Sequence, residues 1–162
     1  MDVHAVFGTL VGALDYSMFI VTVRAGDEQA GCLVGFGCQT SIEPPRFLIC
    51  LSRKNHTCRV AAGADAMAVH VVPQHASELA RLFGSCCGAE VDKFARCTWQ
   101  PGPSGVPILQ DCGNWFVGRV LDQFDFGDHV GFLLDPIAAG GEAGEATFLF
   151  GQAKNIEPGH PA

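Results

Sequence analysis

Apolar residues recur at helical spacing near the start of the chain. Six of them follow a three- and four-residue period: Val3, Val6, Phe7, Leu10, Val11 and Leu14. This spacing predicts an amphipathic helix over residues 3–14. Beyond it, Ser17–Arg24 is rich in β-branched residues and Ala30–Phe36 is a second apolar run. Turn-forming residues separate the two runs, so they predict a hairpin of two strands.

The middle of the chain alternates between apolar runs and turn residues. The run Phe47–Leu51 follows Glu43-Pro44-Pro45. Proline favours an extended conformation in the residue before it, so this run predicts a strand, buried on both faces. Asn55 offers a side-chain cap for a short helix over residues 57–62. Residues 66–72 predict another strand, and a surface helix is predicted over residues 75–83.

Two long strands are predicted in the last third of the chain. They cover Asn114–Phe124 and His129–Ile137, with Gly127-Asp128 as the turn between them. The preceding residues 98–107 are rich in proline and glycine and predict a loop. A last strand is predicted at Thr147–Phe150.

This inventory defines one mainly β domain. It holds six or seven strands, mostly joined by hairpins, and favours a closed or nearly closed antiparallel barrel of Greek-key type with a few short helices. The chain shows no βα alternation and no G-x-G-x-x-G motif, which disfavours a Rossmann fold. With 162 residues, we expect one domain over residues 1–151 and a frayed tail over residues 152–162.

Composition narrows the classes of partner. Hydrophobic residues make up 48% of the chain and charged residues 17%, so we expect some apolar surface to be buried between subunits of a homodimer. The formal net charge of −7 argues against nucleic acid binding, which requires a basic face. No apolar run approaches the roughly 20 residues that span a bilayer. The first residues lack the features of a secretory signal, so we expect a cytoplasmic location.

The chain has eight cysteines but no C-x-x-C pair. This spacing disfavours a zinc site. We interpret most of the thiols as small apolar residues in strands and packed loops. Cys86 and Cys87 are adjacent, and adjacent cysteines do not easily form an unstrained disulfide.

The most informative segment begins at Gly31. It runs through Cys-Leu-Val-Gly-Phe-Gly-Cys-Gln-Thr-Ser-Ile-Glu-Pro-Pro, the strand at Phe47–Leu51 and then Ser52-Arg-Lys-Asn-His-Thr. It is followed by Phe83, Asp92-Lys93-Phe94, Gly105-Val-Pro-Ile-Leu109 and Gly127-Asp-His129. In this order the segments resemble the flavin reductase-like, FMN-binding split-barrel family over about residues 12–137. The resemblance implies a split β-barrel that binds FMN, with FAD as an alternative, and takes hydride from NADH or NADPH. It also implies a flavin-dependent monooxygenase as the partner that receives reduced flavin.

The resemblance assigns flavin-binding positions to the strand end, the following loop and one aromatic residue: Cys32, Leu33, Val34, Gly35, Phe36, Gly37, Cys38, Gln39, Ser41, Ser52, Arg53, Lys54, Asn55, His56, Thr57 and Phe83. Glycines 31, 35 and 37 would let the main chain approach a planar ring; the alternative is that they form bulges where the strand curves. Residues 52–57 offer hydroxyls, cations and free amides at a helix start, a usual site for an oxyanion. Alternatively, residues 52–57 form a solvated turn capped by Asn55.

His129 corresponds to the family histidine beside the docked nicotinamide. Hydride transfer requires alignment rather than an acid or base, so His129 is expected to position the nicotinamide and flavin, unless it is simply exposed at its turn. Leu33–Phe36 replace the family's hydroxyl-rich T-x-S-S, which leaves Gln39, Thr40 and Ser41 as candidate substitutes. Two other functions therefore stay open: a flavin or deazaflavin protein that acts on an organic substrate, and a noncatalytic binding barrel.

Overall fold

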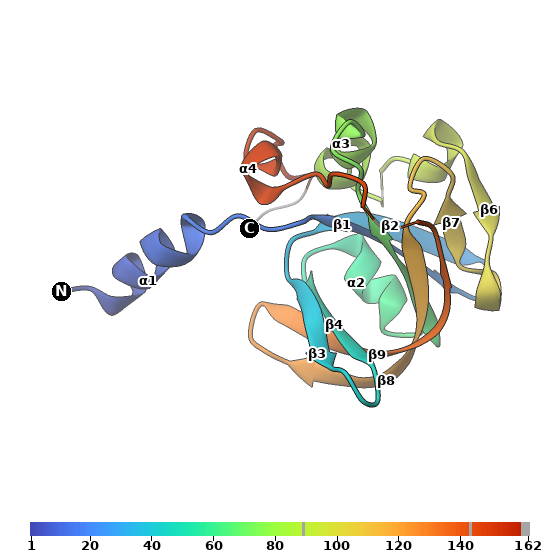
Figure 1. Ribbon diagram of the computed structural model, residues 1–162, viewed down its shortest axis with the longest axis horizontal. Helices are drawn as coiled ribbons and strands as arrows, with labels where there is room; N and C mark the ends of the chain where they lie inside the picture. Colours follow the sequence, from blue (N-terminus) through green and yellow to red (C-terminus); the bar gives the residue numbers. More distant parts are fainter. Residues whose placement is uncertain (89, 143, 160–162) are drawn as a thin grey trace.

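A single antiparallel sheet of seven strands organises the molecule. The computed structural model describes residues 1–88, 90–142 and 144–159. In the sheet the strands lie in the order β2-β1-β5-β8-β9-β4-β3 (Figure 1). In chain order they are β1 Phe19–Ala25, β2 Glu28–Val34, β3 Gly37–Ser41, β4 Arg46–Ser52, β5 Ala66–Val71, β8 Trp115–Asp125 and β9 His129–Gly140. The prediction of a mainly β, antiparallel split barrel is confirmed.

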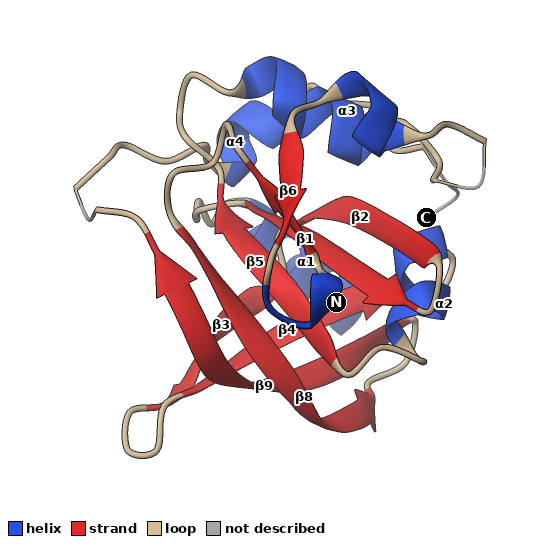
Figure 2. Ribbon diagram, turned by 90° about the vertical axis from the view of Figure 1, so that its right-hand side faces the viewer, coloured by secondary structure: helices blue, strands red, loops and turns tan. Residues whose placement is uncertain are grey.

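The chain itself brings the two ends of this sheet together. β2 and β3 are the first and last strands in the order, yet only Gly35 and Phe36 separate them in the sequence. The Phe36 carbonyl accepts a hydrogen bond from the Cys50 amide of β4 at 2.8 Å. The sheet therefore curls round until its ends meet at this joint, and Figure 2 shows the strands wrapping around the interior.

Apolar side chains fill the barrel and cover its outside. The strands β1 and β5 are mostly apolar because both their faces are buried over most of their length. Inside, the largest buried side chains include Ile49, Leu51, Met67, Phe132 and Leu134. The short helix α2 (His56–Ala61) packs on β1 and β2. Helix α3 (Ser77–Ser85) packs on the outer face of β2 and contributes Leu79, Ala80 and Phe83 to a second cluster.

The proline-rich segment predicted as a loop forms a small hairpin instead. It contains β6 (Trp99–Pro101) and β7 (Pro107–Leu109), with the 3-10 turns η1 (Lys93–Arg96) and η2 (Pro103–Gly105). His70 of β5 anchors β7, since its Nδ1 lies 2.9 Å from the Ile20 carbonyl and its Nε2 accepts from the Leu109 amide at 3.0 Å. The His70 side chain is fully buried, with a partner for each ring nitrogen.

The prediction of a strand at Thr147–Phe150 is wrong. Only isolated bridges form there, Thr147 to Pro73 and Leu149 to Ser17. The chain then enters helix α4 (Phe150–Ala153). The tail was expected to be frayed from residue 152, but Ile156 packs against the core cluster around Phe83 and the Lys154 ammonium donates to the Gly12 carbonyl at 2.8 Å. Residues 160–162 of the predicted tail lie outside the described residues.

The predicted N-terminal helix is confirmed as α1 (Val3–Gly12), capped by the Asp2 carboxylate. It projects away from the barrel, and none of its residues is buried (Figure 1). Within the described residues, no helix is both long and apolar enough to cross a membrane.

Candidate functional site

A cavity of about 300 Å³ opens beside the joint between β2 and β3. It brings together eight of the residues expected at a flavin site: Cys32, Leu33, Val34, Gly35, Phe36, Ser52, Asn55 and His129. Six further residues, which were not among the predicted site residues, also line the cavity: Tyr16, Met18, Cys50, Leu51, Asp128 and Phe150. The strand end and the loop after β4 therefore share one cleft.

One wall of the cavity is the end of β2. Gly35 lies against Tyr16 so closely that a Cβ atom there would stand 3.1 Å from the Tyr16 ring. The Tyr16 ring stacks on Phe150 of α4, with centroids 4.9 Å apart and planes inclined by 10°. Burial and the neighbouring Asp15 carboxylate raise the pKa of Tyr16, so its hydroxyl stays protonated at neutral pH. The wall is thus flat and largely apolar.

The opposite end of the cavity carries polar side chains. The Asn55 carbonyl oxygen caps α2 by accepting from the Thr57 amide at 2.9 Å, which leaves the Asn55 NH₂ group as a donor. The Ser52 oxygen accepts weakly from the Lys54 amide at 3.4 Å, and its hydroxyl proton can point elsewhere. This end can therefore donate hydrogen bonds to an oxyanion.

His129 stands at the cavity mouth because of strand register. It is the first residue of β9 and pairs with Ser52 of β4. Its Nδ1 lies 2.7 Å from the Asp128 carboxylate, and this hydrogen bond lowers the pKa of Asp128. The imidazole also packs on the Phe36 ring, with centroids 4.9 Å apart. Two neighbours therefore fix the ring orientation.

Arg53 does not line the cavity. Its guanidinium donates to the Gly127 carbonyl at 2.7 Å and pairs with the Asp125 carboxylate at 2.6 Å, and it lowers the pKa of Asp125. Arg53 therefore holds the turn between β8 and β9. Lys54 is exposed, and its charge helps to lower the pKa of Asp128 at the cavity rim.

The remaining predicted residues lie away from the cavity. The predicted residues of β3 do not line the cavity, and Cys38 and Gln39 are exposed. His56 faces Glu28, with Nε2 3.0 Å from the carboxylate, and Thr57 is buried. Phe83 is a core side chain whose carbonyl accepts from the buried Lys93 ammonium at 3.1 Å. Nine of the predicted flavin-binding residues therefore do not line the cavity: Gly37, Cys38, Gln39, Ser41, Arg53, Lys54, His56, Thr57 and Phe83.

The cysteines behave mainly as apolar side chains. Cys32, Cys58 and Cys112 are buried, and burial raises the pKa of Cys32 to about 11 and that of Cys112 to about 12. Within the described residues, no group of three or more His, Cys, Asp or Glu side chains could hold a metal ion.

The chemistry of the cavity fits a flavin. An apolar slot suits a planar ring. The end of the edge strand β2 lines the cavity, where its main-chain groups can match the donors and acceptors of the pyrimidine edge, and the Ser52 and Asn55 side chains can bind an oxyanion. A sequence profile described as the flavin reductase like domain matches residues 11–156. The chain belongs to this family.

Relatives within the family carry reductase names. The NADH-dependent FMN reductase RutF of Bradyrhizobium diazoefficiens is 28% identical over 119 residues, covering 74% of this chain and 66% of the relative. The reductase subunit HsaB of a flavin-dependent monooxygenase in Mycobacterium tuberculosis is 31% identical, covering 76% of this chain and 64% of the relative. The matched region thus spans slightly less than two thirds of each of these relatives.

Solved structures share the architecture. An FMN-binding protein from Thermus thermophilus with bound cyclohexenone is 27% identical, with a TM-score of 0.75, and the match covers 82% of this chain and 74% of that one. An NADH:FAD oxidoreductase of Streptomyces globisporus, in complex with NAD and FAD fragments, has a TM-score of 0.80 at 24% identity, covering 91% and 88% of the two chains. At 24% identity, the similarity to the Streptomyces globisporus protein shows a shared fold alone.

Proposed function

We propose that the protein binds FMN in the cavity beside Gly35 and reduces it with NADH or NADPH. One observation carries the proposal: the glycine-bearing end of β2 and the donors Ser52 and Asn55 line the same cavity, with His129 at its mouth. When bound, the flavin would accept a hydride from the nicotinamide. FAD is the alternative ligand for the same ring-binding wall.

The residues of this chain would act by positioning. Backbone groups of residues 32–36 hold the ring, and Ser52 and Asn55 bind the phosphate. His129, held by Asp128 and Phe36, orients the nicotinamide over the ring. Such alignment contributes to rate without any proton transfer by the protein.

The proposal extends to the biological setting. One relative is named as the reductase subunit of a monooxygenase, which supports a role in which this protein supplies reduced flavin to a partner monooxygenase. We also propose a homodimer, in keeping with the low charge and the exposed apolar residues.

Anaerobic reduction tests the function. Purified protein is mixed with FMN and either NADH or NADPH, and the visible absorbance of oxidised flavin is followed. Bleaching by one nicotinamide that depends on the protein concentration is the expected result. No bleaching above the rate without protein contradicts a reductase.

Single alanine variants distinguish the two cations of the loop after β4. Arg53→Ala is expected to weaken FMN and riboflavin equally, by about two- to fivefold, because Arg53 acts through the turn that carries His129. Lys54→Ala is expected to weaken FMN about two- to threefold and riboflavin little, because Lys54 does not line the cavity and its exposed charge acts on the FMN phosphate only at a distance. Fluorescence titration of both ligands gives the comparison. Equal losses for both ligands in Lys54→Ala contradict this electrostatic effect on the phosphate.

A second candidate function keeps the flavin but changes the reaction. The FMN-binding relative with bound cyclohexenone, together with the apolar Phe36 at the cavity mouth, favours a small organic substrate. Rapid oxidation of the reduced protein by an enone, but slow release of free reduced flavin, would support this alternative.

A further inference from the structure

The motif Asp92-Lys93-Phe94 has no role in the proposed function, yet it carries a buried cation. The Lys93 side chain is 4% exposed. Of the ten Lys and Arg residues in the chain, it is the only one that is buried among the residues whose structure is described. A buried charge is costly unless the surrounding groups compensate for it, so the contacts of this ammonium group are informative.

Two backbone carbonyls hold the Lys93 ammonium group. It donates to the Gly31 carbonyl of β2 at 2.8 Å and to the Phe83 carbonyl of α3 at 3.1 Å. Phe83 lies in the last turn of α3, where the helix dipole favours a positive charge. Hydrogen bonds to acceptors also favour the charged form. The two carbonyls and the helix end therefore stabilise Lys93 as a cation.

No acidic side chain neutralises this cation within the described ranges of the chain, since none forms an ion pair with Lys93. Burial lowers the pKa of Lys93, and three nearby thiols, those of Cys32, Cys86 and Cys87, act in the opposite direction. The positive charge is thus balanced by dipoles rather than by an opposite charge. Its field extends into the surrounding protein, where screening is weak.

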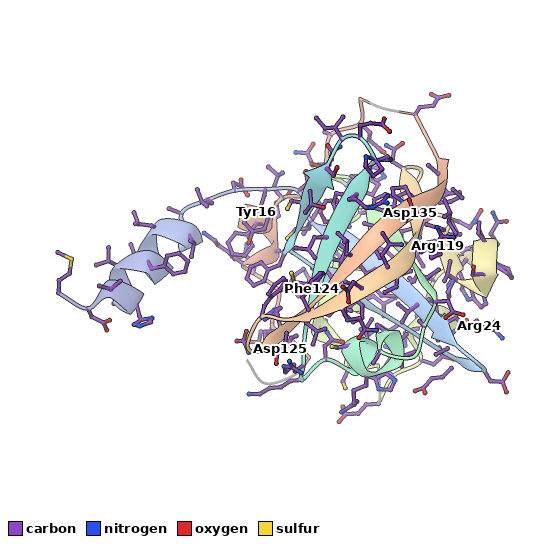
Figure 3. All side chains as sticks on the ribbon, turned by 90° about the horizontal axis from the view of Figure 1, so that it is seen from below. Tyr16, Arg24, Arg119, Phe124, Asp125 and Asp135 are labelled. Atoms are coloured by element: carbon purple, nitrogen blue, oxygen red, sulfur yellow. The ribbon has the colours of Figure 1, made fainter. Side chains whose placement is uncertain are left out.

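Lys93 also lines a polar hollow of about 650 Å³, which is distinct from the flavin cavity. Arg24 lines the hollow and Tyr16 lines the cavity, and Figure 3 shows these two side chains well separated. Most of the other charged side chains around the hollow are exposed, so water screens their effect on the interior. They are Asp27, Glu28, His56, Glu90 and Asp92.

The strand that Lys93 binds is the one that forms the wall of the flavin cavity. β2 is the first strand in the sheet order, so one of its edges is not paired within the sheet. Along such a strand the main-chain groups point alternately toward the partner strand and away from it. Because the Gly31 carbonyl accepts from Lys93, the main-chain groups of Leu33 face the same free edge. Leu33 lines the cavity, about 7 Å along the strand from Gly31.

The charge of Lys93 acts on a residue of the cavity lining. Cys32 lies between Gly31 and Leu33 and lines the cavity. Burial raises the pKa of the Cys32 thiol to about 11, and the Lys93 charge is the largest effect that opposes this rise. The same charge would therefore stabilise a negative charge on a ligand that binds along this part of β2.

The proposed function places a negative charge there. Hydride transfer from NADH or NADPH brings two electrons and one proton to the flavin and leaves the oxidised nicotinamide. The reduced ring then carries one negative charge on its pyrimidine part until a second proton is taken up from solvent. Because the pyrimidine edge is expected against the end of β2, this charge would develop on the side of the cavity where Lys93 lies.

We propose that Lys93 raises the reduction potential of the bound flavin, because its buried ammonium group stabilises the negative charge of the reduced ring across the free edge of β2. This role rests on the proposed function. Lys93 does not line the cavity, so it acts through the field of its charge and not by contact with the ring. It favours the reduced over the oxidised flavin, whereas Ser52 and Asn55 would bind the phosphate in both states.

Reduction potentials of bound FMN test this role. Lys93→Gln keeps an NH₂ donor for the two carbonyls and removes the charge, whereas Lys93→Arg keeps the charge. Lys93→Gln is expected to weaken reduced FMN about tenfold relative to oxidised FMN. For a two-electron couple, this tenfold change lowers the midpoint potential by about 30 mV. Lys93→Arg should restore the wild-type ratio of affinities to within about twofold.

Arg96→Gln is the matched control. Arg96 belongs to the same turn η1 but is exposed, so its charge is screened by water. This variant should have the wild-type potential. The potentials are measured anaerobically by equilibration with a redox dye and a chemical reductant, so they do not depend on a nicotinamide. Circular dichroism checks that each variant is folded.

A measurement on the wild type keeps the test independent of the folding of the variants. The chain has three lysines, Lys54, Lys93 and Lys154, so the NMR signals of ¹³C-labelled lysine side chains can be assigned. Coupling between two sites is reciprocal. Reduction of the bound FMN should therefore increase the proton affinity of Lys93 by the same factor of about ten. A Lys93 side chain that is uncharged at neutral pH, or whose titration does not respond to reduction, overturns the proposal.

The outcomes separate this role from the proposed function. An unchanged potential in folded Lys93→Gln, or an equal fall in Lys93→Arg or Arg96→Gln, overturns the role of Lys93 alone. A wild type that binds no FMN refutes the proposed function and the role of Lys93 with it. A wild type whose bound FMN has a potential that depends on Lys93, but that neither NADH nor NADPH reduces, refutes the reductase and leaves the role of Lys93 supported.

Discussion

Replacing Gly35 with leucine is expected to abolish flavin binding in a barrel that remains folded. A Cβ at this position would already stand 3.1 Å from the Tyr16 ring and 3.4 Å from the Met18 sulfur. The rest of the leucine side chain must then extend into the cavity that the flavin ring would fill. We expect the FMN dissociation constant to rise at least 100-fold, about 3 kcal/mol. Titration monitored by flavin fluorescence measures it.

Gly113→Leu provides the matched control for this experiment. Nothing lies within 4 Å of a Cβ built at Gly113, and this residue does not line the cavity. The control should bind FMN like the wild type. If Gly35→Leu also binds FMN normally while thermal unfolding shows a native barrel, the ring does not lie against the end of β2.

Acidification from pH 7 to pH 4 is expected to destabilise the fold through His70. Burial lowers the pKa of this imidazole from its ordinary 6.5 to about 4, against a smaller opposite effect of the bond to Ile20. Between those two values the unfolded chain binds a proton that the folded chain does not, so the free energy of unfolding falls as pH falls. The difference of 2.5 units (6.5 − 4) corresponds to about 3 kcal/mol. Above pH 6.5 the histidine makes no pH-dependent contribution.

Urea denaturation at several pH values isolates this effect. His70→Gln keeps a donor for the Ile20 carbonyl and an acceptor for the Leu109 amide but does not titrate. Carboxylates with lowered pKa, such as Asp128, add an acid dependence to both proteins, so the difference between the two profiles reports on His70. Parallel profiles would show that the buried histidine does not govern the acid stability.

Local pattern was enough to predict most of the barrel. Continuous apolar runs such as Phe47–Leu51 match buried strands, and the Gly127-Asp128 turn joins the two long strands as predicted. The hairpin of β6 and β7 was missed because each strand has only three residues and begins or ends in proline. What fixes it is tertiary, the buried His70 and the Thr22 hydroxyl that donates to the Pro107 carbonyl at 2.6 Å.

The site was predictable only where it follows from contiguous sequence. The end of β2 and the loop after β4 carry recognisable motifs, whereas Tyr16 and Phe150 reach the cavity from opposite ends of the chain. An isolated bridge between Ser17 and Leu149 brings Tyr16 and Phe150 together. A local sequence pattern does not predict a contact between segments so far apart in the chain. Arg53 shows the converse situation. Its place in a basic cluster favoured a phosphate contact, whereas the fold supplies Asp125 and Gly127 as its partners.

The stacking of Tyr16 on Phe150 at the cavity wall has a thermodynamic consequence. If a bound cofactor packs on this wall, it stabilises the contact between two segments far apart in the sequence, because a ligand that binds only the folded state adds to its stability. Limited proteolysis of the segment that carries Phe150 would then slow as the flavin concentration rises.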